Sequence, residues 1–263
     1  MDDEILLIDK PSGMSSFGVV ARVRRKLSEE AGHKVKVGHT GTLDPFATGL
    51  MILVVGKGTK RAVEFSKLDK VYEAKIRLGA VSTTGDPEGE IIVKQSSERE
   101  FARECKKVLF APDSFKNSSL RDSNSLNELG KPDFFTGETQ CSSDCLTMIS
   151  HVVASFVGEI EQTPPVFSAI KVGGQRAYKL ARKGVEVEMP KRKVRIYSIE
   201  ILEFAWPYLR IRTHVSSGTY IRSLAADIGE KLECGAYVEE LRRIRVGDYD
   251  VSEAQKLPKE GEA

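Results

Sequence analysis

The stretch Lys-Val-Gly-His-Thr-Gly-Thr-Leu-Asp-Pro-Phe-Ala-Thr-Gly, residues 36–49, is the most informative part of the chain. Its three glycines and one proline exclude a helix interior and predict a tight loop. The loop offers one carboxylate, Asp44, and one imidazole, His39, and Pro45 keeps the backbone of Asp44 out of the helical region. This arrangement suits a reactive side chain held at a fixed angle, although an aspartate in a turn commonly only bonds its own backbone.

Apolar patterns outside this loop predict the surrounding elements. Leu50–Val55 is a continuous apolar run and predicts a buried strand. Val71–Ala80 alternates, which places Tyr72 with three apolar residues on the covered face of a second strand. Further strands are expected at 4–8, 91–93, 194–204, 209–215 and 246–251, and helices at 15–29, 98–110, from 146, and at 219–232.

The order of these elements predicts the fold class. Strands, hairpins and interspersed helices without a regular βαβ rhythm favour an α+β fold with a mixed, largely antiparallel sheet. Residues 111–145 are rich in Ser, Asn, Asp and Gly and lack a persistent apolar period, which predicts a surface insertion or a segment without fixed structure. We therefore expect one domain over residues 1–255, with an insertion at 111–145 and a short tail at 256–263.

Size and composition describe a globular protein that needs no membrane. The chain has 263 residues, of which 40% are hydrophobic and 30% charged. No apolar run is long enough to span a bilayer, and the acidic start lacks the marks of a secretory signal or transit peptide. Cys141 and Cys145 are close, but no second Cys/His pair completes a zinc site. We expect free thiols, no metal and a cytoplasmic location.

Basic residues are clustered although the net charge is only +2. The clusters lie at residues 22–26, 191–193 and 242–245. One such cluster is usually a solvated surface. Three clusters near the segments of the proposed active site favour a groove for a polyanion such as RNA, and the arginines would contact its phosphates.

Five motifs, in order, resemble the TruB-type tRNA pseudouridine synthases. The loop motif occupies residues 38–49, and the others are 7–16, 70–72 with 78–79, 163–171, and 218–224 with 241–243. The resemblance covers residues 4–95 and 150–255. It implies one sheet with flanking helices and a central catalytic cleft, no cofactor, and isomerisation of uridine to pseudouridine at position 55 in the T arm of tRNA. Many relatives carry a C-terminal RNA-binding PUA module, for which we expect no room after Val251.

The resemblance also implies roles for particular residues. Asp44 would attack the nucleoside, Arg222 would pair with Asp44, and Tyr72 would stack on the flipped base and assist removal of its proton. Taken singly, each of these residues has an ordinary explanation in packing or on the surface. The implied substrate-binding residues are His39, which would enter the RNA loop in place of the extracted base, Tyr220 and Leu241, which would line the base pocket, and Lys10, which would support the pocket or meet phosphate.

Other interpretations of the sequence stay open. One is a catalytically silent RNA-binding protein of the same fold. Another is an enzyme that acts at a different tRNA position or depends on a guide RNA. A nucleotide-binding enzyme is disfavoured because Gly56–Lys60 lacks the spacing of a phosphate-binding loop. The partner that we expect is the T arm of tRNA, bound by a monomer.

Overall fold

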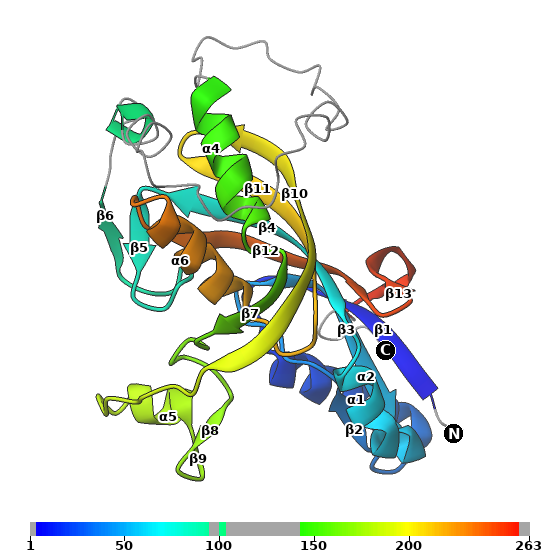
Figure 1. Cartoon of the computed structure of the whole chain (residues 1–263). Coiled ribbons are helices and arrows are strands. Elements are labelled where there is room, and N and C mark those ends of the chain that lie inside the picture. Colours follow the sequence, from blue (N-terminus) through cyan, green and yellow to red (C-terminus); the bar gives the residue numbers. More distant parts are fainter. Residues whose placement is uncertain (1–3, 95–99, 104–142, 258–263) are drawn as a thin grey trace.

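The computed structural model describes residues 4–94, 100–103 and 143–257, and its centre is a ten-stranded sheet (Figure 1). The sheet strands are β1 (Glu4–Lys10), β2 (Val37–His39), β3 (Thr48–Val55), β4 (Lys70–Leu78), β7 (Gly158–Gln162), β10 (Arg192–Ala205), β11 (Tyr208–Val215), β12 (Ala236–Val246), β13 (Tyr249–Asp250) and β14 (Gln255–Lys256). Their order is β14-β1-β3-β12-β4-β11-β10-β7, with β2 beside β3 and β13 beside β12. β1 pairs with β14 and β3 with β12 in parallel, and the other pairs are antiparallel. The predicted mixed, largely antiparallel sheet is confirmed.

Helices and two small hairpins surround this sheet. The helices are α1 (Ser16–Ala31), α2 (Ala62–Ser66), α4 (Ser143–Ala154), α5 (Ala177–Ala181), α6 (Ile221–Lys231) and the 3₁₀ turns η1 (Gly56–Arg61) and η3 (Val251–Glu253). The hairpins are β5 (Ala80–Ser82) with β6 (Ile91–Val93) and β8 (Lys171–Val172) with β9 (Gln175–Arg176). Within the described ranges, no helix is long and apolar enough to cross a membrane.

β3 is buried on both faces, which explains its uninterrupted apolar sequence. Met51 and Leu53 belong to the main core, together with three valines of α1. Leu50 and Ile52 point the other way and belong to a second apolar cluster with Phe65 of α2. The main core lies on the sheet face that α4 and α6 cover.

Two predicted helices are confirmed. α1 begins where expected, because the Ser15 hydroxyl accepts a hydrogen bond from the backbone N–H of Gly18 and caps the helix. α6 occupies the region predicted at 219–232. Its apolar stripe is buried and consists of Ile221, Leu224, Ala225, Ile228 and Leu232. The predicted faces of β4 are also correct, since Tyr72 and its three apolar companions are buried.

The strand predicted at 246–251 is correct only for β13 at Tyr249–Asp250 and for Val246, and it is not continuous. β12 instead ends at Val246, and the chain turns at Gly247, which has a φ of +55°. β12 was missed because its sequence, Ala-Tyr-Val-Glu-Glu-Leu-Arg-Arg-Ile-Arg-Val, is rich in charge, yet it lies in the middle of the sheet between β3 and β4. The strand predicted at 71–80 is divided at Gly79 into β4 and β5.

Two further predictions fall largely on residues that the structure does not describe. Residues 100–103 of the helix predicted at 98–110 are helical, and the parts at 98–99 and 104–110 lie outside the described residues. The insertion predicted at 111–145 lies outside them as far as residue 142, and its expected end falls inside α4, which begins at Ser143. The expected domain and tail boundaries stay predictions.

Substitution of Gly49 tests the close approach of β3 to β12. Gly49 has a φ of +103°, and an added Cβ would lie 2.2 Å from the carbonyl oxygen of Arg243. We expect Gly49→Ala to lower the free energy of unfolding by about 2–4 kcal/mol, measured by urea denaturation. Gly38→Ala is the control, since its Cβ would meet only Val54 at 3.8 Å. Equal losses in the two variants would contradict this account.

Candidate active site

The segment that follows β1 holds the loop around Asp44. The Ser16 hydroxyl accepts a hydrogen bond from the backbone N–H of Leu43 and donates one to its carbonyl, both at 2.8 Å. The backbone N–H of Gly13 donates to the carbonyl of Pro45 at 2.9 Å. The backbone is therefore fixed on both sides of Asp44, which explains why the 7–16 motif and the loop motif occur together.

Lys10 lies beneath the same loop. Its side chain is fully buried, and Nζ donates to the carbonyls of Pro11 at 2.8 Å and Pro45 at 3.0 Å. Burial lowers the pKa of Lys10 to about 8, and the nearby charge of Asp44 acts in the opposite direction. The resemblance implied that Lys10 either supports the pocket or meets phosphate. These contacts agree with support of the pocket, because a fully buried ammonium cannot reach a phosphate at the surface.

Arg243 of β12 holds the loop from the other side. Its guanidinium is buried, with Nε donating to the carbonyl of Leu50 at 2.7 Å and Nη2 to that of Gly41 at 3.3 Å. Arg242 instead pairs with Asp9 at 2.8 Å. The expectation that the 242–245 cluster would contact phosphate is therefore wrong for Arg243, because loop carbonyls occupy its donors.

Asp44 and Arg222 are in contact. Nε of Arg222 lies 3.0 Å from Oδ2 of Asp44, in an ion pair that lacks the geometry of a hydrogen bond. The Arg222 side chain is 4% exposed and that of Asp44 is 33% exposed. The two residues are therefore close together, as predicted. A substrate can reach the carboxylate of Asp44, whereas the guanidinium of Arg222 is buried.

Arg222 also holds a second carboxylate that the sequence analysis missed. Nη1 donates to Oδ2 of the buried Asp86 at 3.0 Å and to the carbonyl of Thr84 at 2.8 Å. Nη2 donates to the carbonyl of Phe167 at 2.8 Å. The sequence of residues 83–89, with two glycines and a proline, is that of a turn, and nothing in it shows that Asp86 lies beside α6.

Burial controls the charge of Asp44. Desolvation raises the pKa of its carboxyl, the charge of Arg222 lowers it, Asp86 raises it and Lys10 lowers it, and the net direction is upward. The arginine thus acts in the expected direction, but burial outweighs it. The pKa of Glu88 is also raised, first by burial and then by Asp86 and Asp44.

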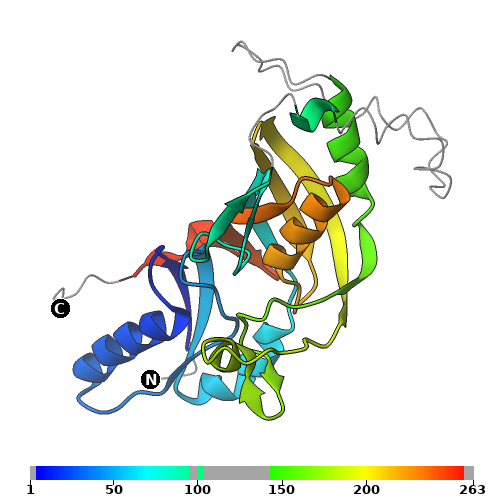
Figure 2. The same cartoon turned by 90° about the vertical axis from the view of Figure 1, so that its left-hand side faces the viewer.

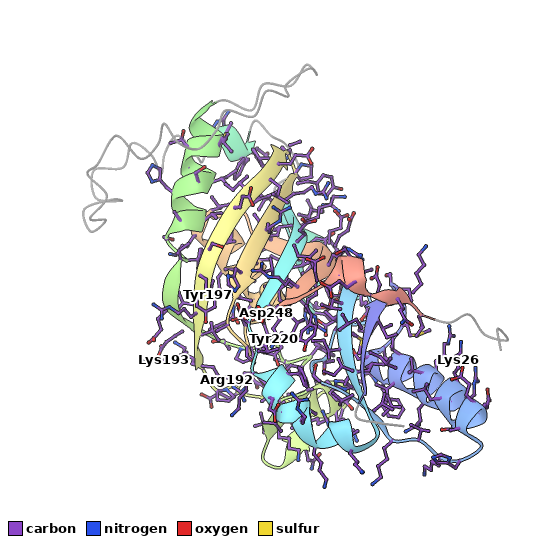
Figure 3. All side chains as sticks on the ribbon, turned by 90° about the vertical axis from the view of Figure 1, so that its right-hand side faces the viewer. Lys26, Arg192, Lys193, Tyr197, Tyr220 and Asp248 are labelled. Carbon is purple, nitrogen blue, oxygen red and sulfur yellow. The ribbon has the colours of Figure 1, made fainter. Side chains whose placement is uncertain are left out.

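The remaining predicted residues lie on the elements around this pair. Tyr220 immediately precedes α6, and the buried Gln162 side chain fixes it by accepting from its N–H at 2.7 Å and donating to its carbonyl at 3.0 Å. Burial raises the pKa of the Tyr220 hydroxyl. Leu241 and Tyr72 lie buried on the neighbouring strands β12 and β4. Figure 3 labels Tyr220 beneath the strands of the sheet.

His39 belongs to β2 and not to the loop itself, which corrects the predicted extent of the loop. Its Nδ1 is buried and makes no hydrogen bond, and burial lowers the pKa of the imidazole, as do the charges of Arg243 and Arg176. No hydrogen bond or ion pair joins His39 or Tyr72 to Asp44 in the described part of the chain. A cleft across the sheet at this point stays a prediction.

Comparison with known proteins assigns the family. The sequence model of the TruB family pseudouridylate synthase N-terminal domain matches residues 24–115 and 134–221. That of the tRNA pseudouridylate synthase B C-terminal domain matches residues 222–259. This chain belongs to the TruB family. The matched residues include Asp44, Tyr72 and Arg222.

Relatives cover nearly the whole chain. The tRNA pseudouridine synthase B of Clostridium kluyveri is 38% identical over 97% of this chain and 71% of its own length. The synthase of Phocaeicola vulgatus is 40% identical over 94% of this chain and 87% of its own length. The synthase of Opitutus terrae is 37% identical over 97% of this chain and 86% of its own length.

Solved structures show the same TruB-like fold. One chain of a Cbf5-Nop10-Gar1 complex is 25% identical with a TM-score of 0.59, over 96% of this chain and 52% of that chain. One chain of an archaeal box H/ACA sRNP Nop10-Cbf5 complex is 24% identical with a TM-score of 0.56, over 96% of this chain and 51% of that chain. The protein thus spans about half the length of these solved chains.

Asp86→Asn tests the second carboxylate. We expect the turnover of tRNA to fall about 10- to 100-fold, because the guanidinium that faces Asp44 loses one of the groups that orient it. Affinity for tRNA should change less than about twofold, because Asp86 is buried behind Arg222. Single-turnover rates and filter binding measure the two effects. Glu90→Gln, an exposed charge in the same connection, is the control, and a wild-type rate for Asp86→Asn would contradict the assigned role.

Proposed function

We propose that this TruB-family tRNA pseudouridine synthase acts on uridine 55 in the T arm of tRNA and that Asp44 performs the reaction. Relatives at 37–40% identity are named tRNA pseudouridine synthase B. The observation that carries the proposal is the 3.0 Å contact between the partly exposed carboxylate of Asp44, in the loop motif, and the buried guanidinium of Arg222. We further propose a cytoplasmic monomer.

The chemistry suits a carboxylate. The isomerisation breaks the N-glycosidic bond, turns the uracil and joins its C5 to the anomeric carbon. C5 loses its proton and N1 gains one. Substrate and product have the same composition and oxidation level, so the reaction requires no electron donor. The Asp44 oxygen can add to the anomeric carbon or to the uracil ring, and both additions need the ionised carboxylate.

Surrounding groups would serve base extraction. Flipping a stacked uridine costs a few kcal/mol, which contacts with the everted base and with the vacated space must offset. Tyr72 is suited to stack on the base, with Tyr220 and Leu241 lining its pocket. His39 has a lowered pKa and is neutral at physiological pH, which suits a ring that replaces a base among other bases.

Loss of Asp44 separates this proposal from a silent RNA-binding protein. We expect the wild type to convert uridine 55 of an unmodified tRNA transcript, and Asp44→Asn to be at least about 1,000-fold slower because no nucleophile remains. Binding of tRNA should stay within about threefold. Mapping of pseudouridine along the transcript and filter binding provide the measurements.

Asp248→Asn is the matched control, since Asp248, labelled in Figure 3, is exposed and makes none of the contacts described above for Asp44. Product at another position would overturn the substrate assignment. An unchanged rate for Asp44→Asn would overturn the assignment of Asp44 as the nucleophile and would favour another residue in that role.

The pH dependence tests the charge state of Asp44. Because the pKa of Asp44 is raised, activity should be lost as the pH falls through a value above the usual range of an aspartate. Arg222 lowers this pKa and Asp86 raises it, so Arg222→Gln should move the acid limb of the single-turnover rate to higher pH and Asp86→Asn to lower pH. If the acid limb moved in the same direction in both variants, it would reflect the titration of a group other than Asp44.

A further inference from the structure

The two ends of a projecting segment meet at Gln162. β7 ends at Gln162 and β10 begins at Arg192, and these two residues are paired across the strands. The chain between them, residues 163–191, therefore leaves the sheet and returns to it at the same place. We call this segment the β8–α5 lobe, because it contains β8, β9 and α5. Figure 2 shows the lobe beyond the ends of β7 and β10, as does Figure 1.

The β8–α5 lobe has a small apolar core that includes a residue of the candidate site. Ile170, Ala177 and Met189 are its buried members, and the partly buried Tyr220 packs against them. The side chain of Tyr220 thus belongs to the lobe by its packing, whereas its backbone leads into α6. Apolar packing is not directional, so it does not by itself fix the position of the Tyr220 ring relative to Asp44.

Gln162 fixes the backbone of Tyr220 from the base of the lobe. The Gln162 side chain is buried, with Oε1 accepting from the N–H of Tyr220 at 2.7 Å and Nε2 donating to its carbonyl at 3.0 Å. These two backbone groups lie on either side of the Tyr220 Cα. Together the two hydrogen bonds fix the direction of the Cα–Cβ bond, about which a single hydrogen bond would leave the residue free to pivot.

The same end of β7 also holds Arg222. The Ser223 hydroxyl donates to the carbonyl of Thr163 at 2.7 Å, so α6 is bonded to this end of β7 on both sides of Arg222. In the described chain, the side chain of Tyr220 makes no capping bond at the start of α6. The position of the guanidinium beside Asp44 therefore depends on the attachment of α6 to β7.

We propose that Gln162 is a positioning residue for the isomerisation, which acts on the target uridine through Tyr220 and Arg222. The inference rests on the proposed function, because it assumes that these two residues surround the reacting nucleoside. Gln162 itself is buried, and both polar atoms of its amide are bonded to Tyr220. A displacement of about 1 Å in an active site costs about 100-fold in rate, so loss of the amide should slow the chemical step more than it weakens RNA binding.

The alternative is that Gln162 only satisfies buried backbone groups at the end of a strand. Its loss would then lower the stability of the protein but leave the rate of the folded protein unchanged. Ser28 of α1 offers a matched control. Its hydroxyl also bonds one backbone carbonyl, that of Arg24 at 2.7 Å, and one backbone N–H, that of Val35 at 3.0 Å. It makes none of the contacts described for the site.

Gln162→Met tests the proposal, because it removes both hydrogen bonds and keeps the length of the side chain. We expect its single-turnover rate at saturating tRNA transcript to fall about 30-fold or more. Its affinity for the transcript, measured by filter binding, should stay within about threefold of the wild type. Ser28→Ala should keep the wild-type rate. Urea denaturation of both variants establishes that each is folded under the assay conditions.

A double variant tests whether Gln162 acts through Tyr220. Independent effects on a rate multiply, whereas effects that pass through a shared residue do not. The fall in rate for Gln162→Met/Tyr220→Ala should therefore be smaller than the product of the falls for the two single variants. Gln162→Asn keeps the amide but shortens its reach by one methylene, and it should also slow the single-turnover rate. This polar variant serves as the test if Gln162→Met does not fold.

Three results would overturn the inference. They are a wild-type rate for the Gln162 variants, a loss of tRNA affinity with an unchanged rate at saturation, and an equal fall in rate for Ser28→Ala. Multiplying effects in the double variant would also contradict action through Tyr220. The wild type is assayed alongside, so a failure of the proposed function is seen separately as the absence of any converted uridine in the wild-type reaction.

Discussion

The structure of the site depends on one buried cation. An unpaired guanidinium inside a protein is strongly destabilising, so each of its donors requires an acceptor. Three separate parts of the chain meet Arg222 of α6: the loop with Asp44 forms an ion pair with it, and the connection with Thr84 and Asp86 and the carbonyl of Phe167 accept its hydrogen bonds. Satisfying this single side chain brings the motifs together in space.

The same principle shapes the loop around Asp44. Residues 40–47 have no regular backbone pairing, and their carbonyls need donors. Lys10 and Arg243 provide them from opposite sides, and both are buried basic residues. Basic residues in these motifs thus serve the fold, although charge-based reasoning alone assigns them to the RNA.

Periodicity predicted the elements that have one apolar face. α1, α6 and β4 were found because their polar residues face solvent, whereas β12 was missed because Arg243 points inward to loop carbonyls. The proximity of Asp44 and Arg222 came from the resemblance of their motifs, since 178 positions of sequence separate them and spacing carries no such information. Asp86 and Gln162 were missed because their partners lie far away in the sequence.

The pairing of β3 with β12 divides the sheet into two parts. Two residue pairs, Arg242 with Thr48 and Arg243 with Gly49, make this parallel junction, whereas β12 pairs with β4 along most of its length. Asp44 belongs to the part that includes β3, and Arg222 and Asp86 to the part that includes β4. Asp44 and its counterion therefore sit across a seam, so that any sliding of one half past the other separates the carboxylate from the guanidinium.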